Sequence, residues 1–253
     1  MSENFYYRYL FFLLLSFLAH QYNRWTLPEA NPFELITVSF EGLNGEGQAE
    51  IRDVKSKNDI DPNLIDYEIS PKSSLSEGQN VTVSAKSEKY RLNPNEKQYQ
   101  VSGLDLYLDD VNKLSSKQLD LLHSSSLSVL DESIGSKSHL DEISNEYVTS
   151  YFFTNHKKNN ILVDVYKYSF VNYEHNLTSE LYLACYYQNL ILRGPNYQSM
   201  DYDYKMYSGD SMPIFSGDYW SPYITAFHSL EEVKAYFLTQ QKVDMEFQER
   251  KAE

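Results

Sequence analysis

The chain contains a single cysteine, Cys185, among its 253 residues. One cysteine cannot form an intramolecular disulfide, and it cannot supply the several thiolates of a cysteine-rich zinc site. Basic residues are also scarce, because 22 Lys and Arg stand against 36 Asp and Glu and leave a net charge of −14. Since proteins hold a phosphate backbone mainly with Lys and Arg, this balance argues against a nucleic-acid partner.

The motifs of common catalytic and cofactor sites are missing as well. The sequence has no G-x-S-x-G elbow, no phosphate-binding loop and no dinucleotide fingerprint. Its histidines are scattered, with no pair at H-x-x-x-H spacing, and Cys185 lies inside an apolar run where a small buried side chain is the usual role. We therefore expect no catalytic residue, no metal site and no cofactor.

An apolar run occupies residues 9–19, directly after Arg8. A helix of this length spans about 17 Å, less than the roughly 30 Å hydrocarbon core of a bilayer. Phe17 stands two positions before Ala19, which fits a signal-peptide cleavage site poorly, and no lipoprotein cysteine follows. We interpret residues 1–30 as a short uncleaved signal-anchor with a stalk; a buried core helix is the alternative.

Residues 31–108 carry the signals of a small β module. Residues 33–40 predict a half-buried strand, because Ile36, Val38 and Phe40 alternate with Leu35, Thr37 and Ser39. Asn44-Gly45 predicts a tight turn of type I′. Further alternating segments follow at 81–85 and 98–104. Short strands separated by polar turns at this spacing indicate an immunoglobulin-like β-sandwich.

Residues 59–66, DIDPNLID, begin like a calcium-binding loop. Leu64 stands where that loop needs Gly for its sharp turn, and Ser70 stands where it needs a bidentate Glu. We interpret the segment as an Asx-rich loop without a metal.

Three stretches of the module carry a family resemblance: NPFELITVSFEGLNGEGQAEI, LSEGQNVTVSA and YQVSGL. They resemble a family of membrane-anchored extracytoplasmic proteins of Firmicutes, streptococci in particular, with a cytoplasmic zinc ribbon, one transmembrane helix and then this β module. The layout is more loosely similar to the teicoplanin-resistance-associated membrane proteins. The resemblance implies a Gram-positive cell-membrane protein with a single pass and its C-terminal bulk outside the cell. Zinc-ribbon cysteines are missing here, and the family implies no catalytic residues.

Residues 109–146 predict a helical connector. Ser115 with Gln118 forms a capping-box pattern ahead of leucines at three- and four-residue spacings. The serines at 124–126 and Gly135 interrupt the pattern, so we expect one broken helix or two short ones.

Residues 147–253 predict an α+β domain. Three segments rich in aromatic and branched residues predict strands, at Tyr147–Thr154, Ile161–Tyr173 and Leu181–Arg193. Ser229-Leu-Glu-Glu232 predicts the start of a C-terminal helix. We expect a curved antiparallel sheet covered partly by helix, in a chain that is mainly β with α+β parts.

Tyrosine is unusually frequent, with 23 residues concentrated in the second half. The candidate ligand-binding residues are aromatic and acidic side chains of one segment: Tyr202, Tyr204, Tyr219, Trp220, Asp201 and Asp203. Aromatic faces beside carboxylates suit a sugar- or peptide-binding groove. Tyrosine also packs half-buried sheets with its hydroxyl in water, so structural packing is the alternative. If residues 201–205 form one strand, the two Asp side chains share a face with Lys205.

These patterns predict a non-catalytic, membrane-anchored extracytoplasmic protein that binds or senses a cell-envelope component or a partner protein. One alternative is a surface immunity protein, whose acidic surface and exposed aromatics complement a basic toxin. Another is an envelope glycan hydrolase that uses the acidic residues of the Tyr-rich segment.

Overall fold

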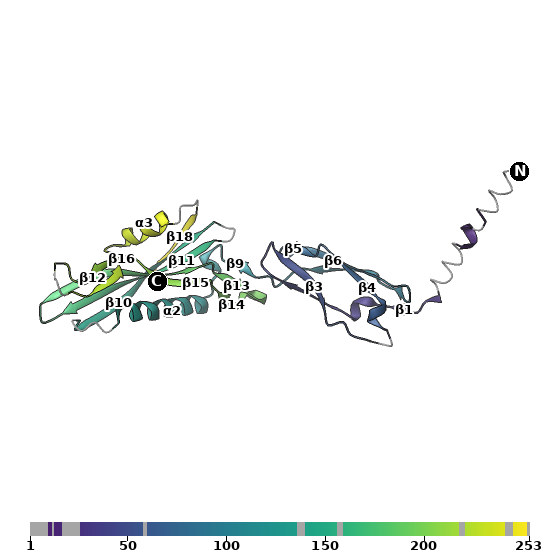
Figure 1. Cartoon of the computed structure of the whole chain (residues 1–253), viewed down its shortest axis with the longest axis horizontal. Helices are drawn as coiled ribbons and strands as arrows, with labels where there is room; N and C mark the ends of the chain where they lie inside the picture. The colour runs from purple at the N-terminus through teal and green to yellow at the C-terminus, as the bar shows by residue number, and fades with distance from the viewer. Residues whose placement is uncertain are drawn as a thin grey trace. The chain divides into compact units, whose positions relative to one another are not determined.

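The computed structural model describes residues 10–11, 13–16, 26–57, 60–135, 140–155, 159–217, 221–240 and 245–251. The chain is mainly β, with several sheets and few helices, as the sequence predicts (Figure 1). It divides into two compact units, Met1–Leu104 and Asp105–Glu253.

The predicted anchor falls largely outside the described residues. Residues 10–11 and 13–16 are helical. In the part of the chain that the structure describes, no helix combines the length and the apolar character needed to cross a bilayer.

The first unit contains two three-stranded antiparallel sheets, ordered β2-β3-β5 and β4-β6-β8. Their strands are β2 (Thr37–Glu41), β3 (Gly47–Arg52), β4 (Asp66–Ser70), β5 (Ser73–Leu75), β6 (Asn80–Lys86) and β8 (Glu96–Gln100). The short parallel pair β1 (Glu29–Ala30) and β7 (Arg91–Leu92) and the 3-10 helices η1 (Pro32–Glu34) and η2 (Pro62–Leu64) lie in the same unit.

Both sheets of the first unit contribute to its hydrophobic core. On β6, Val81, Val83 and Ala85 are buried and alternate with polar residues, as the sequence predicts. Val81 packs in one cluster with Ala49 of β3 and Leu75 of β5, which belong to the other sheet. Each fully buried aliphatic side chain stabilises the fold by about 1.5–3 kcal/mol relative to an exposed one.

Two local predictions for this unit are wrong. The strand predicted to start at Phe33 begins only at Thr37, because Pro32–Glu34 form η1, capped by the Asn31 side chain that accepts from the Phe33 N–H over 3.1 Å. The turn after β2 is not type I′. Glu46 N–H donates to the Leu43 carbonyl over 2.8 Å, and Gly45 takes φ 87° as the third turn residue, which is the pattern of type II.

A five-stranded antiparallel sheet dominates the second unit, in the order β15-β12-β11-β10-β18. Its strands are β10 (Glu142–Thr154), β11 (Asn160–Asn172), β12 (Leu177–Gln188), β15 (Tyr204–Ser208) and β18 (Glu246–Lys251). Smaller elements are β9 (Leu106–Tyr107), β13 (Ile191–Arg193), β14 (Ser199–Asp201), β16 (Asp210–Pro213), β17 (Tyr223–Ala226), η3 (Val111–Lys113) and η4 (Pro195–Tyr197).

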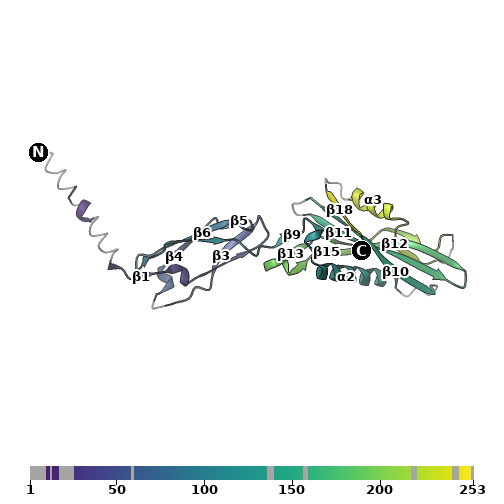
Figure 2. The same ribbon diagram turned by 180° about the vertical axis from the view of Figure 1, so that it is seen from behind.

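Helices cover both faces of this sheet. Figures 1 and 2 show α2 (Ser116–Ile134) and α3 (Leu230–Gln240) on opposite sides of the strands. Leu130 of α2 packs with Tyr168 of β11, whereas Phe237 of α3 packs with Val163 of the same strand. Because neighbouring side chains of a strand alternate between faces, the odd and even residues of β11 serve two separate cores.

The helix α2 is continuous over 19 residues, so the predicted break is wrong. Ser115 and Gln118 form the predicted capping box. Ser126 does not interrupt the helix, because its hydroxyl is buried and donates to Asp164 of β11 over 2.7 Å. Gly135 ends the helix at φ 59°.

The segment predicted as one strand over Leu181–Arg193 is two strands in two sheets. Asn189 takes φ 57° and turns the chain between β12 and β13. The buried side chain of Asn160 holds the new direction: its Nδ2 donates to the carbonyls of Leu108 and Leu190, each over 2.9 Å, and its Oδ1 accepts from Leu190 N–H over 2.7 Å. One amide group thus bonds to three backbone groups of the two segments that meet there, at Leu108 and Leu190.

Candidate functional site

The structure does not place the predicted acidic and aromatic residues on one strand. Asp201 ends β14, while Tyr204 begins β15 in the larger sheet, with Tyr202 and Asp203 between them. The condition for a shared face of the two Asp side chains is therefore not met. Tyr219 and Trp220 lie outside the described residues.

Both predicted carboxylates have structural partners. Asp201 forms an ion pair with Arg193 at 3.1 Å, and the same guanidinium pairs with Asp105 at 2.7 Å. Asp203 accepts from the side-chain amide of Asn189 over 2.8 Å. These contacts hold the turn between β12, β13 and β14 together.

The two predicted tyrosines lie in different surroundings. Tyr202 is half-buried, and its ring meets Tyr187 edge-on with centroids 5.0 Å apart. Tyr204 is 41% exposed, and its ring lies 6.0 Å from that of Tyr186. The structure thus supports packing for Tyr202 and leaves Tyr204 available to a ligand.

Tyr204 belongs to a surface that we name the aromatic edge: Tyr186, Tyr204 and Met206. Met206 is also 41% exposed, and its sulfur accepts a contact from the Tyr204 hydroxyl at 3.4 Å. Tyr186 lies directly opposite Met206 and packs on Phe237 of α3 with ring centroids 5.6 Å apart. The exposed rings are therefore backed by a fixed aromatic core, which suits stacking on a sugar or packing against a protein.

A second feature of the unit is a buried carboxylate, Asp164 of β11. It is 0% exposed and accepts from Ser126 of α2 over 2.7 Å and from Ser150 of β10 over 2.6 Å. Burial raises the pKa of Asp164 above its usual range. Asp164 is not among the residues predicted from the sequence to form a site. The sequence does carry one signal for it, because Asp164 is an acidic residue on the otherwise apolar face of a strand.

His123 of α2 lies beside this carboxylate. Its Nε2 is 3.6 Å from Oδ1 of Asp164 and 3.5 Å from the Ser150 hydroxyl. A serine nucleophile needs its base on one imidazole nitrogen and the carboxylate on the other, but here one nitrogen faces both groups. Ser150 is buried, and its hydroxyl donates a hydrogen bond to Asp164. His123, Ser150 and Asp164 therefore act as a polar cluster that joins α2 to the sheet.

Cys185 is fully buried in the core beneath α2. Burial raises the pKa of its thiol to about 11. Since the thiolate is the reactive form, this side chain is an inert core residue at neutral pH, as the sequence predicts.

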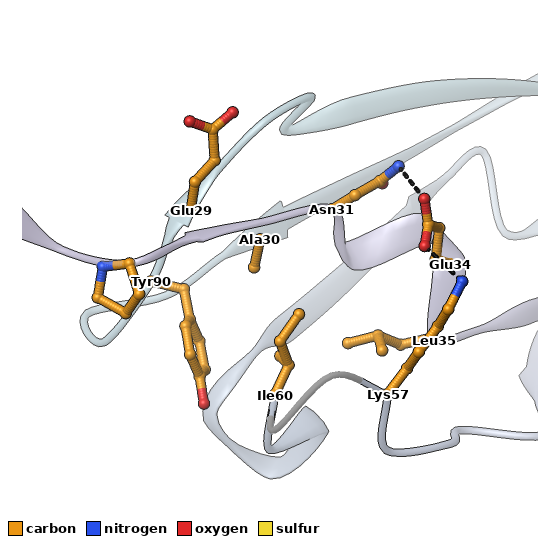
Figure 3. Close-up of a pocket in the computed structure, with 9 residues that line it drawn as sticks. Glu29, Ala30, Asn31, Glu34, Leu35, Lys57, Ile60 and Tyr90 are labelled. Carbon is orange, nitrogen blue, oxygen red and sulfur yellow. Dashed lines mark hydrogen bonds and ion pairs between the residues drawn. The ribbon is translucent and has the colours of Figure 1, made fainter.

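The described parts of both units contain pockets. The pocket in Figure 3 is in the first unit, between the stretch that precedes η1 and the Lys57–Ile60 bridge. Two of its charged side chains pair with each other, Glu34 with Lys57 at 2.7 Å. Glu34 also accepts from the Asn31 side-chain amide over 3.3 Å, and the dashed lines of Figure 3 mark both contacts. The Glu29 side chain points away from the pocket and binds Arg91.

A pocket in the second unit we name the helix pocket. It lies between α2 and the edge of the sheet and has a volume of about 490 Å³. It is lined by Ser116, Leu119, Asp120, His123, Tyr147, Arg250 and Lys251.

The residues that the structure describes contain no group of three or more His, Cys, Asp or Glu side chains placed to hold a metal ion. In the calcium-like segment, Asp59 lies outside the described residues, and Asp61 caps η2 by accepting from Asn63 N–H over 3.0 Å.

Comparisons of the chain with protein-family models, curated proteins and solved structures found no match.

Proposed function

We propose that this chain is a non-catalytic, membrane-anchored extracytoplasmic protein that binds a cell-envelope component or a partner protein through the aromatic edge. The observation that carries the proposal is the exposure of Tyr204 and Met206, at 41% each, on an ordered aromatic base. Two adjacent large apolar side chains on the end strand of a sheet are a binding surface of the kind that glycans and proteins use.

The engagement of the predicted carboxylates supports a binding role over a hydrolase. Asp201 is paired with Arg193, and Asp203 accepts from Asn189. A glycosidase needs two carboxyl groups free to face one bond, and these two are held by their own neighbours.

The anchor is supported by the apolar residues near the N-terminus. Leu10, Phe11 and Leu13 to Leu15 are each at least 45% exposed. Contiguous apolar surface of this kind is unfavourable in water and favourable in lipid. The family resemblance of residues 31–108 supports a single-pass topology with the C-terminal bulk outside the cell.

For the first unit we propose an immunoglobulin-like sandwich. Two antiparallel sheets that share one core, including Val81, Ala49 and Leu75, support this fold.

External protease on intact cells tests the topology. Loss of the C-terminal unit without lysis is the expected result, and protection of that unit in intact cells with digestion after lysis contradicts it.

Co-sedimentation with purified wall fragments and surface crosslinking test the binding surface. The double variant Tyr204→Ser, Met206→Ser is expected to lose about tenfold in binding, since an aromatic or sulfur–aromatic contact contributes about 0.3–1.5 kcal/mol and two are removed. Tyr223→Ser is the matched control, because Tyr223 is 61% exposed on β17 and lies outside the aromatic edge. Equal binding by both variants contradicts the proposed surface.

The net charge of −14 favours a second candidate, a surface immunity protein that captures a basic toxin. Co-purification with a cationic partner in low salt, lost at high salt, is the result expected of that role.

A further inference from the structure

Most arginines in the described part of this acidic chain are paired with carboxylates. Of the four arginines that the structure describes, three form ion pairs: Arg52 with Glu41, Arg91 with Glu29, and Arg193 with Asp105 and Asp201. Arg250 is the exception, because no carboxylate within the described residues pairs with it.

The fold directs Arg250 into the helix pocket. Arg250 pairs with Ser150 across β18 and β10, and Ser150 pairs with Asp164 across β10 and β11. Residues directly opposite one another share a face of a sheet, so Arg250 lies on the face that α2 covers. Since β18 is the outer strand, its side chain lines the space beside the helix.

The opposite wall of the pocket carries the opposite charge. Asp120 of α2 lines the same pocket, and it forms no ion pair with Arg250 within 4.0 Å. The two charges therefore face one cavity of about 490 Å³ without neutralising each other, which is within the range of pockets for small molecules. The pocket of Figure 3 differs, because there Glu34 and Lys57 pair directly.

Two aromatic rings, those of His123 and Tyr147, also line the pocket. The rings of His123 and Tyr147 are 4.4 Å apart, and the Tyr147 hydroxyl bonds Ser150 over 2.7 Å. A register shift in β10 next to Tyr147 places both Tyr147 and Ser150 toward α2. These two rings are thus in place before any ligand arrives.

We propose that the helix pocket binds a small zwitterion, a free amino acid or a short peptide. The ligand carboxylate binds Arg250, whose planar guanidinium can donate two parallel hydrogen bonds to it, and the ligand ammonium pairs with Asp120. Lys251, which also lines the pocket, adds to the attraction for the carboxylate end.

Saturation-transfer NMR on the full chain in detergent micelles tests the site, with glycylglycine as the probe. N-acetyl-glycylglycine and glycylglycine amide each lack one charge, and each is expected to bind at least about tenfold more weakly because one charged hydrogen bond is lost. Glycine that binds as well as the dipeptide identifies a free amino acid; a stronger dipeptide signal identifies a peptide.

Substitutions in the pocket test which side chains bind the two charged ends of the ligand. Arg250→Gln and Asp120→Asn are each expected to weaken glycylglycine at least about tenfold. The matched controls Arg52→Gln and Asp210→Asn are expected to stay within about twofold, since Arg52 is ion-paired in the first unit and Asp210 lies on β16. If Arg250→Gln fails to fold, two measurements still test the proposal. They are the binding of the capped peptides to the unaltered chain and the binding of glycylglycine to Asp120→Asn.

Three results overturn the proposal. The first is the absence of any saturable glycylglycine signal. The second is equal binding of the capped and free peptides. The third is equal binding of acetate or inorganic phosphate, which identifies a simple anion site.

Discussion

Ser150 and Asp164 lie directly opposite each other on β10 and β11, and the serine hydroxyl donates to Oδ1 of the carboxylate over 2.6 Å. Ser126 of α2 donates to the other oxygen over 2.7 Å. One buried carboxylate thus joins two strands and a helix. Because a buried polar group is costly when it loses its partners, this joint couples helix docking to the integrity of the sheet.

Replacing Asp164 with Leu is expected to lower the free energy of unfolding by about 3–5 kcal/mol, because both serine hydroxyls lose their acceptor in a dry site. Urea unfolding followed by circular dichroism measures the change. The triple variant Asp164→Leu, Ser126→Ala, Ser150→Ala is the control. It is expected to recover much of the loss, since no polar group is then left unpaired. A triple variant no more stable than the single one contradicts this reading.

The thiol of Cys185 is expected to resist modification well into alkaline solution. Its folded pKa is raised to about 11, above the ordinary value, so ionisation is less favourable in the folded protein than in the unfolded one. The stability that this shift contributes is present below the unfolded pKa and is lost as pH rises through the folded value. At pH 9 about 1% of the folded thiol is ionised, against roughly half or more of an exposed one.

A colour-producing disulfide reagent at pH 8 measures this directly. Reaction is expected to be slow without denaturant and fast above the unfolding midpoint in urea. Rapid labelling of the folded chain would falsify the burial of this side chain.

Gly209→Ala is expected to cost at least about 2 kcal/mol. Gly209 takes φ 154°, and an added Cβ would lie 2.8 Å from the Ala226 carbonyl oxygen, which β17 holds in place. Gly217 is the matched control, because it also has positive φ, 87°, but an added Cβ there meets nothing within 4 Å. Its replacement by Ala is expected to cost about 1 kcal/mol. Thermal unfolding of both variants separates the backbone strain, which both share, from the steric clash with Ala226, which only Gly209→Ala has. Equal losses of stability in the two variants contradict the clash.

Ser115→Ala is expected to destabilise the chain by about 1 kcal/mol through loss of the α2 cap, where the serine oxygen accepts from Gln118 N–H over 3.3 Å. Ser124→Ala lies inside the same helix and is exposed. It is expected to be neutral or slightly stabilising, because Ala is the better helix former. Urea midpoints that fall equally for the two variants count against a capping role.

Local rules predicted the elements whose local signal agrees with their final surroundings. The Ser115 cap and the alternation through Val81 and Val83 are examples, since a cap and a one-sided strand depend on neighbouring residues. They failed where tertiary contacts decide. The serines of α2 weaken a helix in isolation, yet Ser126 is held by a carboxylate that lies 38 positions along the chain.

The edge strand β18 gave no recognisable signal, because its residues Glu246–Lys251 are mostly charged or polar. Such residues are common in an outer strand, but from the sequence alone they indicate an exposed loop. Pairing with β10 is what brings Arg250 to α2, so the helix pocket could not be found before the register was known. Of the candidate residues in the Tyr-rich segment, Tyr204 lies at an exposed surface, whereas Tyr202 packs on Tyr187 and Asp201 pairs with Arg193.

The side-chain amide of Asn160 takes the place of a backbone peptide group in the hydrogen bonding between two segments. It donates twice, to Leu108 and Leu190, and accepts once from Leu190. Aspartate has the acceptor but no donors, and glutamine is a methylene too long, so the genetic code offers this position no equivalent. Descendants of this gene are therefore expected to keep asparagine there as strictly as an enzyme keeps its nucleophile, for a reason that is wholly architectural.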